Sequence, residues 1–494
     1  MFHVAIDLGA GSGRSVLGRI GEDGVVLEEV HRFAYPPAAA GGRLRWPFAR
    51  VLDGIRQGLG LAHAAAARRG GTLATVGVDS WGVDYGLLDA GGRLLEDPVC
   101  YRDHRTDGAI ERVLRKVPRG EIFQRTGIQF LQFNTLFQLH EHVREGLPTG
   151  ARRLLMIPDL CHHALCGAAC GEYTNASTTQ LLDVRTRRWA EDLFSRVGLP
   201  RELMPEPAPP GTPLGELRPA IQKELGLGPL GVLAPATHDT ASAVAGCPLA
   251  PGWAYVSSGT WSLVGVELAS PLVNEEVARA NFTNEGGVDG SVRFLKNVMG
   301  LWILESCRHE WEERRLSADL EDLLAAAAAI ERPPGFVYPD HPRFFNPESM
   351  TREVQAALSE SGQRVPDDPA RLARVVLDSL ALRYASVVRA IERLTGNAVP
   401  GIHIVGGGCH NEYLNQATAD AAERPVLAGP AEATATGNVL VQALAGGRLA
   451  SIEEGRALVR AAARPRRYEP RRSAAWAEAT ARYAEIEGLF TDVA

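Results

Sequence analysis

The sequence predicts an α/β fold in which strands and helices alternate along the whole chain. A short apolar run at residues 231–233 precedes a predicted helix at 240–245, and another at 401–405 lies between two predicted helices. A strand, a turn of small residues and a second strand occur at residues 4–20 and again at 253–266. Such alternation is typical of a mainly parallel central sheet covered by helices. With 494 residues, the chain has room for two or three domains of about 100–200 residues each.

The two hairpins share one pattern. In the first, a turn at residues 7–14 joins two strands, and residues 25–30 add a third strand. In the second, a turn at 257–260 joins strands at 253–256 and 261–266. The repeat is far longer than the 20–50 residues of a solenoid array. The spacing therefore leaves two explanations open, an internal duplication or two unrelated hairpins.

Breaks in the alternation of strands and helices predict a domain boundary and a surface loop. Glycine, proline and cysteine at residues 246–252 predict a domain boundary, so we expect domains at 1–246 and 247–494. The proline-dense segment 204–213 predicts an extended surface loop. Residues 294–302 predict a helix that enters the second half.

The second half contains the longest predicted helix. Asp368 and Pro369 supply an N-cap and a proline in the first turn, and apolar residues then keep helical spacing until Gly396. Residues 473–489 predict a last amphipathic helix.

Composition and charge exclude several classes of protein. Hydrophobic residues make up 45% and charged residues 22%, which excludes a disordered chain, a collagen and a disulfide scaffold. The net charge of −7 gives no overall attraction to nucleic acid or to anionic membranes. No apolar run reaches the ~18 residues of a membrane span, and no signal-peptide pattern opens the chain. We expect a cytoplasmic protein with neither a nucleic-acid nor a membrane partner.

Two common nucleotide-binding signatures are absent from the sequence. None of the lysines, Lys116, Lys223 and Lys296, follows a glycine, so there is no P-loop. The protein-kinase motifs D-F-G and V-A-I-K are missing as well. If the protein handles ATP, it uses another fold.

The seven cysteines include a local cluster with two interpretations. Cys161, His162, His163, Cys166 and Cys170 are residue types that bind zinc. Their spacing fits a structural zinc site poorly, which favours a buried helix at residues 160–169 in a reducing cytosol.

The first glycine motif, residues 7–14, predicts a phosphate-binding loop. Gly9, Gly11 and Gly13 permit backbone amides to face an anion. It is not a dinucleotide fingerprint, because a strand follows where a helix is required. Asp7, at the end of a strand beside this loop, could orient a hydrated Mg²⁺. The alternative is a tight hairpin without a ligand.

Three further motifs each have a functional and a structural interpretation. The glycine run 406–408 is either an anion site before a helix or a plain strand–helix turn. Asp239 follows the strand 231–233 and either accepts a proton from a hydroxyl or caps a helix. Residues 79–84 place a tryptophan and a glycine between carboxylates, which suits a sugar contact or a packed turn.

Taken together and in order, the motifs resemble the FGGY family of carbohydrate kinases over residues 4–445. The most specific stretches are residues 77–89, 126–139, 172–183, 238–245, 257–264, 281–287 and 403–411. The resemblance implies two duplicated ribonuclease-H-like domains of the actin and sugar-kinase type, with a cleft between them. It decides the open question of the hairpins in favour of duplication.

The resemblance also implies an activity. We expect ATP-dependent phosphorylation of a small-molecule sugar with Mg²⁺, the acceptor being the C1 hydroxyl of L-rhamnulose. The alternatives are a related ketose or polyol kinase, such as a fuculokinase or ribulokinase, and an actin-like ATPase with no sugar substrate. The sequence leaves the choice between monomer and homodimer open.

Site residues are carried over by motif. Asp239 stands at the position of the catalytic base, and Asp7 at that of the Mg²⁺-orienting aspartate. The expected sugar-binding residues are Gly82, His238, Asp239, Thr240 and Asn297. The expected ATP-phosphate and nucleotide contacts are Ala10, Gly11, Ser12, Gly13, Arg14, Thr260, Gly407 and Gly408. Glu305 replaces a glutamine of close relatives and receives no expected role.

Overall fold

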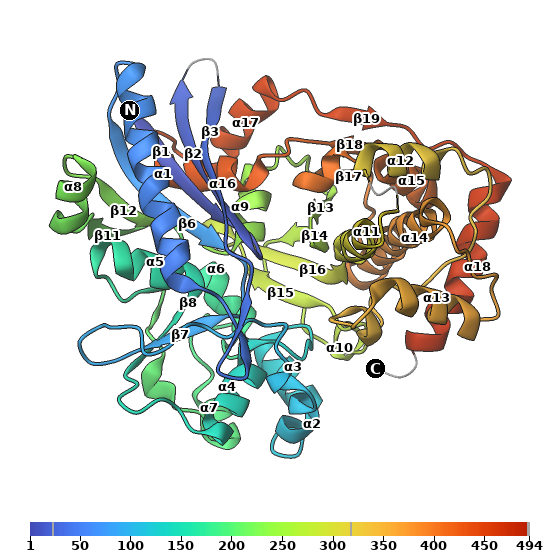
Figure 1. The fold of residues 1–494 in the computed structure, drawn as a ribbon, viewed down its shortest axis with the longest axis horizontal. Helices are drawn as coiled ribbons and strands as arrows, with labels where there is room; N and C mark the ends of the chain where they lie inside the picture. The colour runs from blue at the N-terminus through green and yellow to red at the C-terminus, as the bar shows by residue number, and fades with distance from the viewer. Residues whose placement is uncertain (22–23, 317–318, 492–494) are drawn as a thin grey trace.

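A computed structural model of the chain describes residues 1–21, 24–316 and 319–491. It contains two large mixed sheets that lie side by side, with β1 to β3 in blue and β13 to β16 in yellow-green (Figure 1). The first sheet has the order β11-β12-β6-β1-β2-β3 and the second β15-β16-β14-β13-β17-β18-β19. The strands of the first are β1 (Phe2–Leu8), β2 (Ser12–Gly21), β3 (Gly24–Ala34), β6 (Leu73–Ser80), β11 (Thr212–Glu216) and β12 (Gly231–Ala234). Those of the second are β13 (Ala254–Ser258), β14 (Trp261–Leu268), β15 (Thr283–Gly286), β16 (Val292–Met299), β17 (Ile402–Val405), β18 (Val426–Ala428) and β19 (Arg466–Tyr468).

The pairing of the strands confirms the duplication. β1 pairs antiparallel with β2 and parallel with β6, and β13 pairs antiparallel with β14 and parallel with β17. Outward from these central strands, β3 corresponds to β16, β12 to β18 and β11 to β19, each with the same strand direction. Within the described residues, the second sheet differs only by the extra edge strand β15. Both halves therefore bring the turn of their first hairpin to the carboxyl end of a parallel pair.

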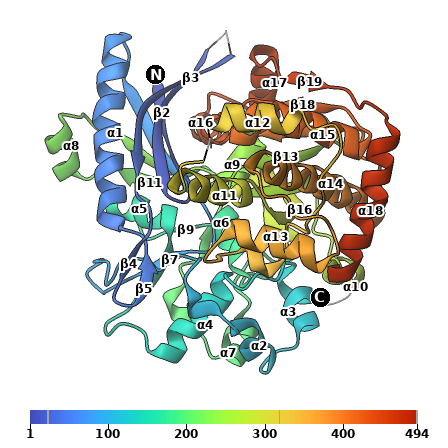
Figure 2. The same cartoon turned by 45° about the vertical axis from the view of Figure 1, so that its right-hand side comes forward.

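Two helices, one from each half, cross between the sheets (Figures 1 and 2). These are α9 (Asp239–Gly246) and α16 (Ala433–Ala445). A Cβ atom on Gly437 would lie only 1.8 Å from Ser242 O, so the two backbones touch. α16 also packs on β1 and β6 of the first sheet, and α9 contacts both β6 of the first sheet and β13 of the second. This crossing fixes the start of α9 relative to both sheets.

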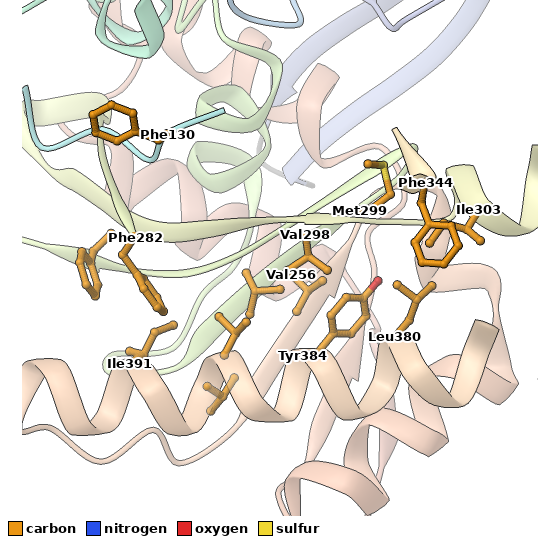
Figure 3. Close-up of a cluster of buried hydrophobic side chains, with 14 of the residues drawn as sticks. Phe130, Val256, Phe282, Val298, Met299, Ile303, Phe344, Leu380, Tyr384 and Ile391 are labelled. Atoms are coloured by element: carbon orange, nitrogen blue, oxygen red, sulfur yellow. The ribbon is translucent and has the colours of Figure 1, made fainter. Parts of the chain in front are cut away.

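The long helix α14 (Pro369–Thr395) forms as predicted. Asp368 caps it by accepting a hydrogen bond from Arg371 N, and Gly396 ends it with a φ of 71°. The Tyr384 hydroxyl bonds Ser262 Oγ at 2.6 Å. Figure 3 shows the apolar face of the helix against the second sheet, with Leu380, Tyr384 and Ile391 from the helix and Val256, Val298 and Met299 from the strands.

The predicted helix at residues 294–302 is wrong. Residues 294–299 form most of β16, which pairs with β14 over its whole length, and α11 (Trp302–Glu313) begins only at the last residue of the predicted range. The periodicity of a short apolar run does not distinguish a buried strand from a buried helix. Here the segment forms a strand because it pairs with β14 on one side and β15 on the other.

Two predicted loops are shorter than expected. The first hairpin turn comprises only residues 9–11, because Asp7 and Arg14 are paired strand residues. The proline-dense segment 204–213 contains β10 (Pro207–Ala208) and the start of β11.

The remaining elements surround the two sheets. The helices are α1 (Phe48–Arg68), α2 (Ala109–Leu114), α3 (Arg119–Thr126), α4 (Thr135–Glu145), α5 (Ile157–Cys166), α6 (Tyr173–Ala176), α7 (Glu191–Val197), α8 (Pro219–Leu225), α10 (Glu275–Arg279), α12 (Leu320–Ala328), α13 (Met350–Glu360), α15 (Glu412–Ala422), α17 (Ile452–Ala462) and α18 (Ala474–Thr491). The strands are β4 (Ala38–Ala40), β5 (Arg43–Arg45), β7 (Tyr85–Leu88), β8 (Arg153–Met156) and β9 (Gly171–Glu172). No helix in the described part of the chain has both the length and the hydropathy to cross a bilayer.

Candidate active site

A cavity of about 570 Å³ lies between the two halves. Its wall includes both hairpin turns, the turn after β17 and the start of α9. Eleven residues expected in the site line it, namely Asp7, Ala10, Ser12, Arg14, Gly82, His238, Asp239, Thr240, Thr260, Asn297 and Gly407. Segments that are hundreds of residues apart in sequence thus meet at one place.

Three expected glycines lie outside the wall of this cavity. Gly13 faces the core, where an added Cβ would meet Leu8 Cδ2 at 2.7 Å. Gly408 lies against the second hairpin, and a Cβ there would be 2.0 Å from Ser258 Oγ. Gly11 has a φ of 123° in the first turn. These glycines let the two turns approach closely or bend, which is a backbone role.

The first hairpin presents a charged pair to the cavity. Arg14 donates to Asp7 Oδ2 from Nε at 2.9 Å and from Nη2 at 2.7 Å, and it also pairs with Glu432. Within the turn, Gly9 N donates to Ser12 O and Gly11 N to Gly9 O. The amides of these two glycines are therefore occupied by the hairpin.

Asp239 is the first residue of α9 and opens into the cavity. Its side chain is 29% exposed, and its Oδ1 accepts a hydrogen bond from Thr240 N. Burial, followed by the negative charge of Asp7, raises the pKa of Asp239 to about 6. A carboxylate with such a pKa can hold or release a proton near neutral pH, as a general base requires.

His238 joins Asp239 to the second sheet. Its Nε2 lies 3.6 Å from Asp239 Oδ1, and its Nδ1 lies 3.0 Å from Arg293 Nη2. Arg293 in turn pairs with Glu285 at 3.1 Å. Burial, followed by the charge of Arg293, lowers the pKa of His238 far below its usual value, so the imidazole is neutral.

A buried carboxylate holds the backbone in front of Asp239. Glu172 Oε2 accepts hydrogen bonds from Thr237 N at 2.9 Å and from Thr237 Oγ1 at 2.7 Å. Nearby, Thr174 Oγ1 accepts from His238 N at 3.1 Å. The segment 172–183 therefore fixes the loop that carries the candidate base.

Residues 79–84 combine both interpretations given by the sequence. Gly82 lines the cavity and packs so closely on Thr178 that a Cβ would lie 2.8 Å from its Oγ1. Trp81 lines it too, whereas Asp84 is fully buried and accepts hydrogen bonds from the indoles of Trp46 and Trp81. Burial raises the pKa of Asp84 to about 6. Asp84 organises the turn, and Gly82 and Trp81 form the surface.

Asn297 is held against the wall of the cavity by Gln129. Gln129 Oε1 accepts from Asn297 N at 2.9 Å and from its Nδ2 at 3.1 Å. Beside them, the aromatic rings of Phe133 and Trp261 lie 5.3 Å apart. This side of the cavity offers amide groups and apolar faces, the usual lining of a sugar site.

Family models match both halves of the chain. The N-terminal domain of the FGGY family of carbohydrate kinases matches residues 3–246, and its C-terminal domain matches residues 254–446. The chain belongs to the FGGY family of carbohydrate kinases. It is therefore a kinase whose acceptor is a carbohydrate.

Curated FGGY kinases and solved structures extend the comparison. The rhamnulokinase of Bacteroides thetaiotaomicron is 40% identical, with 96% of each chain covered, and that of Pectobacterium carotovorum is 42% identical, with 95% of this chain and 93% of the relative covered. A xylulose kinase structure from Lactobacillus acidophilus superposes with a TM-score of 0.77 at 14% identity, covering 100% of this chain and 97% of the other. The glycerol kinase of Plasmodium falciparum with ADP gives 0.74 at 14% identity, with 99% and 98% covered. The two structural matches show the same fold.

Several wall and support residues of this FGGY kinase escaped the sequence reasoning. They are Glu172, Glu285 and Arg293, together with Gln129. Gln129, Glu172 and Glu285 lie in the stretches 126–139, 172–183 and 281–287, on which the family resemblance rests, but the resemblance gave these three residues no role. Arg293 lies in none of the stretches, so the family resemblance could not have identified it.

The cysteine cluster gives no metal centre. All seven cysteines are free, and no group of metal-binding side chains that could hold an ion occurs among the residues that the structure describes. Cys161 is buried, and burial raises the pKa of its thiol. Glu305 lies apart from the cavity wall and pairs with Arg308 at 2.6 Å.

Proposed function

We propose that the protein phosphorylates L-rhamnulose at its C1 hydroxyl with ATP, giving L-rhamnulose 1-phosphate and ADP. The observation that carries the proposal is the position of Asp239, half-buried at the start of α9 in a cavity that both hairpin turns also line. The names of the full-length relatives support L-rhamnulose as the acceptor.

In the proposed reaction, Asp239 accepts the proton of the C1 hydroxyl. The hydroxyl oxygen forms a bond to the γ-phosphorus, and the bond from that phosphorus to the bridging oxygen of ADP breaks. Gly82, His238, Thr240 and Asn297 bind the sugar around this carboxylate. Because the phosphoryl transition state is loose, the proton moves late, and a base of pKa near 6 is sufficient.

We assign the phosphate groups of ATP to the two hairpin turns. Ala10, Ser12 and Arg14 come from the first hairpin and Thr260 from the second, with Gly407 against the nucleotide, while Gly11, Gly13 and Gly408 give these turns their backbone shape. The polar groups of these two hairpins and the guanidinium of Arg14 would offset the negative charge of the phosphates. Closure of the two halves would exclude water from the reacting oxygen.

The donor set in this cavity fits a hydrated Mg²⁺. Asp7 is the carboxylate that would orient the ion, and buried Asp79 lies behind it on the adjacent strand, with an Oδ1 that has no hydrogen-bond partner. Magnesium commonly takes one or two protein carboxylates and completes its shell with water and phosphate oxygens. When bound, it would neutralise charge on the phosphates.

The proposal includes the domain division and the location of the reaction. We assign residues 1–246 to a sugar-binding domain and 247–494 to a nucleotide-binding domain. The limits of the two family models support this division. A reaction that consumes ATP and a small sugar belongs in the cytoplasm.

A substrate panel tests the function. Purified protein is assayed for ADP formation with saturating ATP and Mg²⁺ and with L-rhamnulose, L-fuculose, L-ribulose or D-xylulose. We expect the highest kcat/KM for L-rhamnulose. A higher kcat/KM for another ketose would identify that ketose as the substrate instead of L-rhamnulose. ADP formation that no sugar stimulates would favour an actin-like ATPase.

A further inference from the structure

A fully buried arginine connects the two halves of the molecule behind the sugar side of the cavity. Arg293 lies on β16, has no exposed surface and, within the described residues, forms no part of the cavity wall. Its Nε donates to Gly286 O at 2.8 Å, its Nη1 lies 3.1 Å from Glu285 Oε2, and its Nη2 lies 3.0 Å from His238 Nδ1. All three nitrogens of the guanidinium thus have a partner within the protein, and a substrate in the cavity would not touch Arg293.

The contact with Arg293 determines where the hydrogen of His238 is. A guanidinium carries only N–H donors, so His238 Nδ1 must accept. A neutral imidazole has one N–H, which therefore lies on Nε2. That nitrogen is 3.6 Å from Asp239 Oδ1, and His238 lines the cavity. His238 thus presents a donor beside the candidate base.

A second group competes for the same ring nitrogen. Glu285 Oε2 lies 3.5 Å from His238 Nδ1, and a carboxylate can only accept. Without Arg293, this carboxylate would draw the hydrogen to Nδ1 and leave Nε2 with a lone pair. The side of the ring that faces Asp239 would then be an acceptor. The identity of the residue at position 293 decides between the two tautomers.

We propose that Arg293 is a positioning residue that holds His238 in the Nε2–H tautomer, so that the imidazole donates a hydrogen bond into the sugar pocket and leaves Asp239 as the proton acceptor there. The sugar-binding consequence rests on the proposed function, whereas the tautomer itself does not. Loss of the Nε2–H donor removes one hydrogen bond to a sugar oxygen. The expected effect is a rise of about tenfold in KM for the sugar.

Nitrogen NMR on the unmodified protein tests the tautomer directly. The 13 histidines are labelled with ¹⁵N, and a His238→Gln sample identifies the signals of His238. We expect a protonated Nε2 and an unprotonated Nδ1 at neutral pH. A protonated Nδ1 in the unmodified protein would overturn the proposal, and no catalysis is needed for this readout.

Two double variants separate positioning from packing. Both Glu285→Gln/Arg293→Met and Glu285→Met/Arg293→Met remove the buried charges as a pair, so neither leaves one of them unpaired. The glutamine amide can donate to His238 Nδ1 and take over the role of the guanidinium, whereas methionine cannot.

We expect Glu285→Gln/Arg293→Met to keep the Nε2–H tautomer and to raise KM less than Glu285→Met/Arg293→Met does. In Glu285→Met/Arg293→Met no group holds Nδ1 in either form, so we expect a mixture of the two tautomers and a KM higher by up to about tenfold, with kcat changed less than KM. Equal tautomers and equal KM values in the two variants would overturn the proposal. Absence of sugar kinase activity in the unmodified protein would instead reject the proposed function.

Discussion

Asp7 and Asp79 are register partners on the adjacent parallel strands β1 and β6. Their side chains come from corresponding positions near the carboxyl ends of the two strands. Asp79 is fully buried, and burial followed by the charge of Asp7 raises the pKa of Asp79 far above its usual value. Arg14 donates two hydrogen bonds to Asp7 Oδ2, whereas Asp79 Oδ2 accepts from the side-chain amide of Asn438.

Neutralising Asp79 should stabilise the metal-free protein. The folded-state pKa of Asp79 is raised, so its contribution to stability is present at low pH and is lost as the pH rises through that pKa. At pH 7 we expect Asp79→Asn to raise the free energy of unfolding by about 1–2 kcal/mol without Mg²⁺. The variant should also need more Mg²⁺ for half-maximal activity. Denaturant unfolding and a Mg²⁺ titration of the activity measure the two effects, and a less stable variant contradicts the first.

Removing the proton acceptor should abolish turnover while leaving the fold intact. Asp239→Asn keeps an oxygen that can accept from Thr240 N, so α9 should start as before. We expect kcat to fall by about 10²–10⁴, the usual contribution of a general base. ATP binding, measured by calorimetry, should change little. A kcat within about threefold of the unmodified protein would reject Asp239 as the base.

The activity should follow the ionisation of Asp239. A base must be deprotonated to act, and the pKa of Asp239 is raised to about 6. Below that pH, kcat/KM should fall tenfold for each pH unit, and above it kcat/KM should level off. A pH profile between about 4 and 8 checks this, with a stability control at each pH. A limb near the ordinary aspartate value of about 4 would show that burial and Asp7 do not act on the base in the free enzyme.

The close crossing of α9 and α16 should tolerate no side chain. A Cβ on Gly437 would meet Ser242 O at 1.8 Å and Gly246 N at 2.8 Å, and backbone atoms cannot move aside as a side chain does. We expect Gly437→Ala to cost about 2 kcal/mol or more and to lower kcat, because α9 carries Asp239. The matched control is Gly446→Ala, where the nearest atom is Gln442 O at 3.4 Å. Thermal unfolding measures the stability of both variants, and equal stabilities would contradict the prediction.

Local signals in the sequence were sufficient for several elements and for most of the cavity wall. The N-cap Asp368 and the terminating Gly396 act within a few residues, so α14 could be predicted from residues 368–396 alone. The hairpin turns and Asp239 likewise sit in short motifs whose turn chemistry is local. Ala10, Thr260 and Gly407 reach the cavity as expected because each belongs to such a turn.

Other features depended on contacts between distant residues. Strand β16 was predicted as a helix, since its apolar run is compatible with both and only pairing with β14 and β15 selects the strand. Arg293 reaches His238 because that strand places it there, 55 positions away in sequence. Glu172 similarly bonds Thr237 across 65 positions.

By itself, the sequence determined the class of fold, the two hairpins with turns of small residues and the acidic residue between them, because each is specified by backbone preferences of neighbouring residues. Only the tertiary structure decided which carboxyl groups have a raised pKa, which nitrogen of the His238 ring carries the hydrogen and which glycines face the core. These properties depend on burial and on the charges of groups brought together by sheet register and helix crossing, and neither is encoded in any single segment.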